Sequence, residues 1–440
     1  MYLGPVAKSR LPVFSGEPHP RGRLETVVWD IGVNGRRPLR RRRADRRCLA
    51  ERGRRSRSLA LTLPEKALPL TVAIISHNRP VLCSDAVRSV LATAEAWPGP
   101  CTLRVYDSSG APARIEDPRV TVRHCPELPG VLGKRKLAEA ECDTEWLIYM
   151  DDDCRMLPNA LAAFGGAVAD ANANVAAFIC NTRFVGDRGF WFRCLEGTDY
   201  FSDFQQCKRL EPVPWGPTAL SAFRVPALRR CGAFDMLMGT RTGGEDVHAC
   251  LVLREFGSVI MGIPQELVEH NTETWNSFSA NARRAFNYGQ GDAELCRIWP
   301  RHRLWDPGAP MLVFAVLLLA ADGIAAAHPV DRVWIGVAIL VFVGANFLSL
   351  VLREWTAHPG KKLAELLGFC LLRLYYQGGG IRMRLVNPDP TLLVKRFDWT
   401  WAWSLTNQNG RVFAWSQLGP WLSMLASLGA MLFLATVGNG

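Results

Sequence analysis

The sequence predicts an α/β protein with a mostly parallel β-sheet covered by helices on both faces, followed by an α-helical membrane region. Between residues 70 and 151, short apolar runs alternate with stretches of helical spacing, and each apolar run ends in a polar loop. Past residue 300, long apolar runs with few charges appear. We therefore divide the 440 residues into a basic tail at 1–68, an α/β domain at 69–300 and a membrane region at 301–440.

The net charge of +11 lies entirely in the first 57 residues, which hold 16 basic and 5 acidic residues. This segment has no sustained periodicity and is rich in Arg, Gly and Pro, so we expect a disordered tail. The alternative is an attraction to anionic lipid head groups. The rest of the chain has no net charge, which argues against a nucleic-acid-binding surface, and we expect no nucleic acid partner.

The 13 cysteines are scattered singly, and no Cys-x-x-Cys pair occurs. Their odd number and spacing argue against a disulfide framework and against a zinc site. This cysteine usage favours a reducing compartment.

The first predicted strand, at 70–75, is rich in β-branched residues and is followed by the polar turn Ser76-His77-Asn78-Arg79. A helix is expected at 81–94, and further strands at 103–106 and 120–123, the first of which ends at Asp107. A helix at 130–141 carries Lys134, Arg135 and Lys136. The alternation of strands and helices is typical of a parallel sheet.

Three acidic residues, Asp151, Asp152 and Asp153, directly follow the apolar strand 146–150. Their mutual repulsion and desolvation must be offset, and a divalent cation such as Mg²⁺ or Mn²⁺ would do so. The alternative is a solvated acidic turn that only ends the strand. Ligands of parallel sheets bind at the carboxyl ends of the strands, where Asp107 and the turn at His77 are also expected, and this convergence favours a binding site.

The sequence contains neither a Gly-x-Gly-x-x-Gly fingerprint after the first strand nor a phosphate loop of the Gly-x-x-x-x-Gly-Lys-Ser/Thr type. If phosphates bind here, a metal ion and side-chain cations must hold them. Asp151 and Asp153 can hold the metal, and Lys134 or Arg135 can approach the phosphates. A solvated helix face is the alternative for these basic residues.

A second acidic motif, Gly243-Gly244-Glu245-Asp246, precedes a predicted helix at 247–256. Acidic residues in a first helical turn favourably oppose the helix dipole, so a capping role is one reading. A chemical role is the other, because a carboxylate separate from the metal pair can act as a general base. His270 is a lone histidine, and lone histidines are more often structural.

These motifs, together with Pro158 and the segment 231–235, resemble the inverting glycosyltransferases of family 2, which have the GT-A fold. The resemblance covers residues 70–275. It implies a nucleotide-sugar donor, a divalent metal (Mn²⁺ or Mg²⁺) on the Asp-x-Asp motif and a catalytic base on the Glu-Asp motif. His77 stands where relatives commonly have an aromatic residue, and Lys136 replaces the usual Asn, so both positions depart from the family pattern.

The resemblance also implies roles for single residues. Asp107 would contact the nucleotide base, and Asp246 would be the general base while Glu245 orients the acceptor. The metal ligands would be Asp151, Asp153 and His270. The nucleotide-sugar-binding residues would be Ser76, His77, Asn78, Arg79, Asp107, Lys134, Arg135, Asp151 and Asp152.

Aromatic residues occur between the two acidic motifs: Trp191, Tyr200, Phe201, Phe204 and Trp215. They suit an acceptor groove for a sugar or an isoprenoid chain, and they equally suit core packing. The amphipathic stretch that follows, at 275–298, lacks the Gln-x-x-Arg-Trp motif of processive synthases. We therefore expect transfer of a single sugar, with a processive polysaccharide synthase or a catalytically silent membrane scaffold as alternatives.

Apolar runs at 311–327, 333–352 and 412–437 predict three transmembrane helices, because about 20 such residues span a bilayer. The loop 353–411 is rich in Arg and Lys, and within it 361–376 reads as an interfacial helix. The positive-inside bias predicts a multi-pass protein of the cell membrane with a cytoplasmic catalytic domain. The expected acceptor is then lipid-linked or otherwise membrane-associated, such as a saccharide on a lipid of the cell envelope, with membrane lipids as further partners.

Overall fold

The computed structural model describes residues 68–208, 212–234, 243–305, 322, 326–327, 329–387, 389–399 and 429. The strands are β1 Leu70–Ser76, β2 Cys101–Asp107, β3 Val120–His124, β4 Trp146–Asp151, β5 Cys154–Met156, β6 Val175–Val185, β7 Leu220–Arg224, β8 Val259–Asn271, β9 Arg303–Trp305 and β10 Lys395–Phe397. The helices are α2 Pro80–Glu95, α3 Val131–Glu141, α4 Ala160–Ala169, α5 Phe190–Leu195, α6 Asp199–Ser202, α7 Val225–Cys231, α8 Glu245–Glu255, α9 Phe278–Ile298, α11 Pro329–Ala357 and α12 Leu363–Val386, with 3₁₀ helices at η1 Asp203–Lys208, η2 Glu273–Trp275, η3 Pro300–His302 and η4 Pro390–Leu392.

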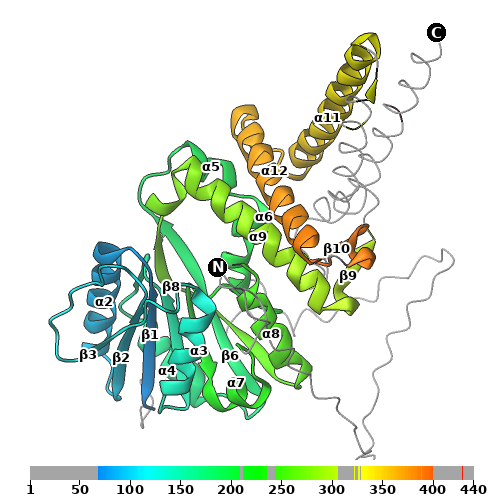
Figure 1. The fold of residues 1–440 in the computed structure, drawn as a ribbon. Coiled ribbons are helices and arrows are strands. Elements are labelled where there is room, and N and C mark those ends of the chain that lie inside the picture. Colours follow the sequence, from blue (N-terminus) through cyan, green and yellow to red (C-terminus); the bar gives the residue numbers. More distant parts are fainter. Residues whose placement is uncertain are drawn as a thin grey trace, which may run out of the picture. The chain divides into compact units, whose positions relative to one another are not determined.

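The main sheet of the described residues has eight strands in the order β3-β2-β1-β4-β7-β6-β8-β5 (Figure 1). Strands β3, β2, β1 and β4 run parallel to one another, and β6 is parallel to β8. Strands β7 and β5 pair antiparallel with their neighbours. The predicted mostly parallel sheet is therefore confirmed, and the antiparallel strands are an addition to it.

Helices cover both faces of the sheet, as the sequence predicts. On one face, α2 and α4 pack against strand residues such as Val72 and Ile148. On the other face, α3, α7 and α8 pack against residues such as Ala73 and Tyr149. The two sets alternate along each strand because successive side chains point to opposite faces. Burying both faces explains why these strands read as continuous apolar runs.

Helices α9 and α12 lie side by side with an unusually close backbone contact (Figure 1). A Cβ at Gly289 of α9 would lie 1.8 Å from the carbonyl oxygen of Tyr376, and one at Gly379 of α12 would lie 1.9 Å from the carbonyl oxygen of Phe286. Only glycine allows this approach, because any side chain would hold the backbones apart. The sequence analysis read 361–376 as an interfacial segment, whereas α12 packs along α9 of the α/β domain.

The predicted span 333–352 lies within α11. Among the residues that the structure describes, no helix is long and apolar enough to cross a membrane, so this span is not supported. The predicted span 412–437 falls outside the described residues except for residue 429, and 311–327 falls outside them except for 322 and 326–327. The basic tail also lies outside them, apart from residue 68.

Candidate active site

A cavity of about 640 Å³ lies at the carboxyl ends of the central strands. The ends of β1 and β4, the start of α8 and residues of α9 supply its walls. Residues of α12 and the segment around β10 complete it on the far side. The strand ends meet because β1 is in parallel register with β2 and β4, which pairs Ser76 with Asp107 and Ile75 with Asp151.

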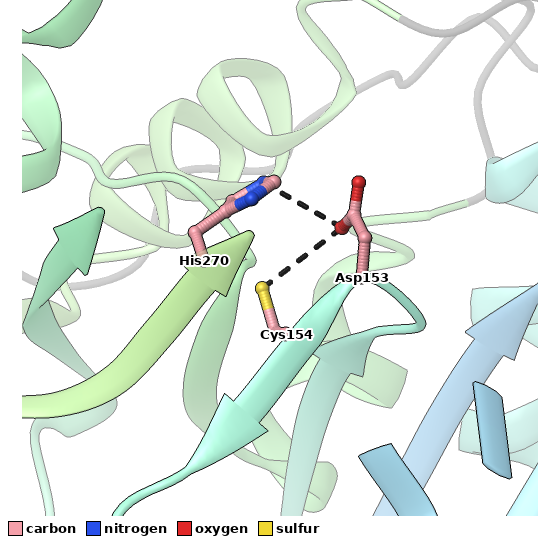
Figure 2. Close-up of side chains that lie close together, drawn as sticks. All are labelled: Asp153, Cys154 and His270. Carbon is pink, nitrogen blue, oxygen red and sulfur yellow. Dashed lines mark hydrogen bonds and ion pairs between the residues drawn. The ribbon is translucent and has the colours of Figure 1, made fainter. Parts of the chain in front are cut away.

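Asp153, Cys154 and His270 form a buried group at one end of this cavity (Figure 2). Their potential ligand atoms lie within 4.8 Å of one another, and Nε2 of His270 is 3.5 Å from Oδ1 of Asp153. The group forms because β5, which begins at Cys154, pairs with β8, placing Cys154 opposite His270. The structure therefore brings together Asp153 and His270, two of the three metal ligands expected from the sequence, whereas Asp151 is not part of this group.

The chemistry of this group fits a hard divalent cation. Burial lowers the pKa of His270, so the imidazole is neutral near pH 7, and its Nδ1 lies 3.2 Å from the carbonyl oxygen of Asn271. A hydrogen bond from Nδ1 to this carbonyl would leave the Nε2 lone pair directed toward Asp153. Although burial raises the pKa of Asp153, its interactions with His270, Arg79 and Arg284 lower it overall, so the carboxylate is ionised. Burial raises the pKa of the Cys154 thiol, which stays protonated and is a poor ligand for Mn²⁺ or Mg²⁺.

Positively charged side chains also offset the negative charges of residues 151–153. Nη1 of Arg79 lies 2.9 Å from a carboxylate oxygen of Asp152 and 2.9 Å from one of Asp153. Arg284 of α9 lines the same cavity and stacks on the ring of Trp275, 3.5 Å from its centroid. The sequence predicts a metal ion that offsets the negative charges of residues 151–153, and in the structure Arg79 and Arg284 also contribute positive charge near them. Arg284 was not among the predicted site residues.

Lys134 is fully buried at the junction of β1 and β2. Its Nζ donates to the carbonyl oxygen of Ser76 and to Oγ of Ser108, both at 2.7 Å. Burial lowers the pKa of this amine. Ser76, His77 and Lys134 all line the cavity, as the sequence analysis predicts for donor-binding residues.

Asp107, the last residue of β2, and Asn78, in the turn after β1, are not among the residues that line the cavity. Oδ1 of Asp107 accepts from the backbone N–H of Ser109 at 2.8 Å, and Oδ2 accepts from that of Ala113 at 3.0 Å. These bonds hold the loop after β2. Asn78 has a positive φ of 55° and its N–H donates to Oγ of Ser109. The contact between Asp107 and a nucleotide base remains a prediction, and both carboxylate oxygens already have partners.

Arg135 connects the acidic turn with the start of α8. Its Nη1 is 3.1 Å from Oε1 of Glu245, and its Nη2 is 3.6 Å from Oδ1 of Asp151. The guanidinium is almost fully buried, so both carboxylates depend on it for compensation. Burial nevertheless raises the pKa of Asp151 to about 7 against the opposing charge of Arg135.

Asp246 lies in the first turn of α8 and lines the cavity. Two glycines with positive φ, Gly243 and Gly244, precede the helix and allow the tight turn. Oδ1 of Asp246 accepts from the N–H of Val247 at 2.8 Å. Burial, followed by the charge of Glu245, raises the pKa of Asp246 to about 7. A carboxylate with this pKa is suited to take a proton near neutral pH.

The aromatic residues between the two motifs all pack in hydrophobic clusters. Trp191, Tyr200, Phe201 and Phe204 pack in one aromatic cluster, and Trp215 lies in the core beneath the sheet. Tyr200, Phe204 and Trp215 also line the cavity. The core-packing interpretation is therefore confirmed, and a role of the three cavity residues in acceptor binding remains a prediction.

Sequence reasoning missed the contribution of the segment after residue 300. The cavity lining includes residues from α12 and from the segment around β10: Arg373, Tyr376, Gln377, Arg384, Arg396 and Trp399. No local motif marks them, but the run Gly378-Gly379-Gly380 inside a helical stretch was a usable signal of close packing.

Residues 71–232 match the family model described as "Glycosyl transferase family 2". This range holds the strand edge with Asp151, Asp152 and Asp153, and it ends before Glu245 and Asp246. The chain is a glycosyltransferase, and its α/β domain agrees with the predicted GT-A type. A comparison with curated protein sequences gives no match.

Similar solved structures are glycosyltransferases. One is a mannosyltransferase from Pyrobaculum calidifontis in complex with GDP-Man and Mn²⁺, with 16% identity over 74% of this chain and 94% of that chain and a TM-score of 0.41. Another is TarS of S. aureus, with 10% identity over 71% of this chain and 92% of that chain and a TM-score of 0.35. GalNAc-T7 with UDP, GalNAc and Mn²⁺ has 15% identity over 52% of this chain and 48% of that chain, with a TM-score of 0.36. These similarities are distant, and the assignment above rests on the sequence match.

Proposed function

We propose that this glycosyltransferase moves one sugar from a nucleotide-sugar donor to an acceptor hydroxyl, with inversion at the anomeric carbon. The observation that carries the proposal is the arrangement of one cavity. It holds a carboxylate–imidazole pair suited to a divalent metal at Asp153 and His270, and a separate carboxylate, Asp246, suited to proton transfer. Inverting transfer needs both parts, because the base must lie apart from the leaving diphosphate.

In this proposal Asp153 and His270 would hold Mn²⁺ or Mg²⁺, with donor phosphates or water as further ligands. When bound, the metal would supply positive charge for the leaving nucleoside diphosphate. Asp246 takes the proton of the acceptor hydroxyl while the acceptor oxygen bonds to the anomeric carbon and the bond from that carbon to the diphosphate breaks. Arg135 fixes Glu245 beside this base, and Lys134 holds the strand ends that form the donor side.

The test is donor binding and transfer over a panel of UDP- and GDP-sugars with Mn²⁺ or Mg²⁺. We expect Asp153→Asn to weaken donor binding, and Asp246→Asn to keep donor binding while transfer falls by about 10²-fold or more. Asp170→Asn, at an exposed residue after α4, is the matched control and should behave like the parent. If no donor binds the parent, or if both site variants match Asp170→Asn, the proposal is wrong and the silent scaffold replaces it.

We also propose that the protein acts at the cell membrane, with a cytoplasmic catalytic domain and a lipid-linked or other membrane-associated acceptor. The apolar runs after residue 300 support this, as do large exposed apolar side chains on α11 and α12, such as Leu340, Trp355 and Leu363. The test is alkaline carbonate extraction of membranes from cells expressing the full chain. Retention in the pellet is expected, and release into the supernatant would contradict the proposal.

A further inference from the structure

The cavity continues past Asp246 into a part lined by η1, α9 and α12. Three polar side chains from these elements face it: Asp203, Tyr288 and Gln377. Within the described part of the chain, none of the three makes a side-chain hydrogen bond. Asp203 and Tyr288 lie close enough to Asp246 to interact with its charge.

Removing polar groups from bulk water costs free energy unless ordered water or a ligand forms hydrogen bonds with them. Here the groups are a carboxylate, a phenol and an amide, which together accept from and donate to hydroxyl groups. A fourth group, Asp292, accepts at Oδ2 from Nε1 of Trp399 at 2.8 Å and from the hydroxyl of Tyr376, whereas among the described residues its Oδ1 has no hydrogen-bond donor. The ligand of this region should therefore carry several hydroxyls at different positions.

Aromatic rings form the rest of this wall. Trp399 lies 5.6 Å from Trp215 and 5.0 Å from Phe397 between ring centroids, and all three line the cavity. A pyranose offers an apolar C–H face to such rings while its hydroxyls point to the sides. An alkyl or isoprenoid chain would fill the aromatic part but would leave the carboxylates and the amide unbonded.

The groups beside Asp246 favour a neutral acceptor hydroxyl over a phosphate at this point. Glu245 and Asp203 both lie close enough to interact with the charge of Asp246, and Arg135 is already paired with Glu245. Arginines also line the cavity on the side of α12 and β10, where Arg373 is paired with Asp199 and Arg384 donates to the carbonyl oxygen of Lys395. A phosphate beside Asp246 would be repelled by the neighbouring acidic groups, whereas neutral hydroxyls can donate to them.

We propose that the region between η1, α9 and α12 binds the terminal sugar of a saccharide acceptor, with Asp203, Tyr288 and Gln377 as the acceptor-binding residues. The inference rests on the proposed function, because it presumes a donor sugar delivered beside Asp246. It places acceptor selection on α12, outside the family-matched residues 71–232.

The test compares two kinds of acceptor for the full chain in detergent with its donor. One is a set of p-nitrophenyl glycosides of glucose, galactose, mannose and N-acetylglucosamine, and the other is undecaprenyl phosphate without a sugar. We expect transfer to at least one glycoside and none to undecaprenyl phosphate. Tyr288→Phe and Gln377→Leu should each raise the KM for the glycoside about 10-fold, while donor affinity stays within about twofold of the parent.

Tyr375→Phe is the matched control, since Tyr375 is 40% exposed on α12 and does not line the cavity. Unchanged donor affinity shows that the variants fold. Transfer to undecaprenyl phosphate alone, transfer to no glycoside, or a glycoside KM unchanged in both variants would overturn the inference while leaving the donor site intact. A parent that binds no nucleotide sugar would instead overturn the proposed function itself, and this inference with it.

Discussion

The backbone contact between α9 and α12 can be tested with two adjacent glycines of α12. A Cβ at Gly379 would lie 1.9 Å from the carbonyl oxygen of Phe286, whereas a Cβ at Gly378 would lie 3.7 Å from the Phe286 ring. Alanine at 379 therefore requires the helices to move apart by roughly 1 Å, and such overpacking costs about 1–3 kcal/mol. Alanine at 378 requires no movement.

Both substitutions gain the same helix propensity, about 0.5–1 kcal/mol, so the difference between them isolates the steric cost. We expect Gly379→Ala to be about 1–3 kcal/mol less stable than Gly378→Ala, measured from urea midpoints by tryptophan fluorescence. Transfer should fall by up to about 10²-fold in Gly379→Ala only, because Tyr376 and Gln377 move with α12. Donor binding should persist, since its residues lie on other elements. Equal midpoints and equal transfer in the two variants would refute the close contact.

Three further outcomes follow from the site. If Asp246 is the base, kcat/KM rises with pH through the pKa of Asp246, which is about 7. Glu245→Gln removes a neighbouring negative charge and should move this rise to lower pH, whereas Arg135→Met removes a positive charge and should move it to higher pH. A shift in the same direction for both variants would contradict the assignment. EDTA should abolish transfer, and Mn²⁺ should restore it. His270→Ala should raise the Mn²⁺ concentration for half-maximal activity by about 10-fold or more. Activity in EDTA equal to that in Mn²⁺ would exclude the metal role. Lys134→Met removes the buried amine that donates to the carbonyl oxygen of Ser76 and to Oγ of Ser108, and leaves that carbonyl only its bond from the backbone N–H of Ser108. Unfolding in urea should therefore cost about 1–3 kcal/mol less than in the parent, and an unchanged midpoint would argue against this role.

The first half of the sheet could be predicted because its strands are short apolar runs closed by polar turns. Strands at 70–75 and 146–150 agree with β1 and β4 within one residue at each end. Their parallel register then places Ser76, Asp107 and Asp151 at one edge without any knowledge of side-chain positions. The antiparallel β7 was not anticipated, because pairing direction depends on how the chain returns and not on the composition of the strand.

It was harder to predict which site residues lie next to each other than to predict which residues belong to the site. Asp151 and Asp153 are two residues apart, yet Asp151 lies beside Arg135 and Asp153 lies beside His270. The pairing of β5 with β8 determines that Asp153, and not Asp151, lies beside His270, because it places Cys154 opposite His270. Sequence spacing alone treats the two aspartates as equivalent, so the metal role of Asp151 remains a prediction.

The contribution of α12 was missed because the residues after 300 were assigned to a membrane region, with 361–376 as an interfacial helix. A glycine in a helix interior costs about 1 kcal/mol relative to alanine, so three in a row need a compensating contact. In the structure, Gly379 and Gly289 provide that contact by letting two backbones touch, and this contact turns Gln377 toward the cavity that holds Asp246. The proposed donor side is formed mainly by the family-matched residues, whereas α9 and α12 close the opposite side. Under this proposal, substitutions in α9 and α12 would change the acceptor without altering the residues proposed to bind the donor, such as Asp153.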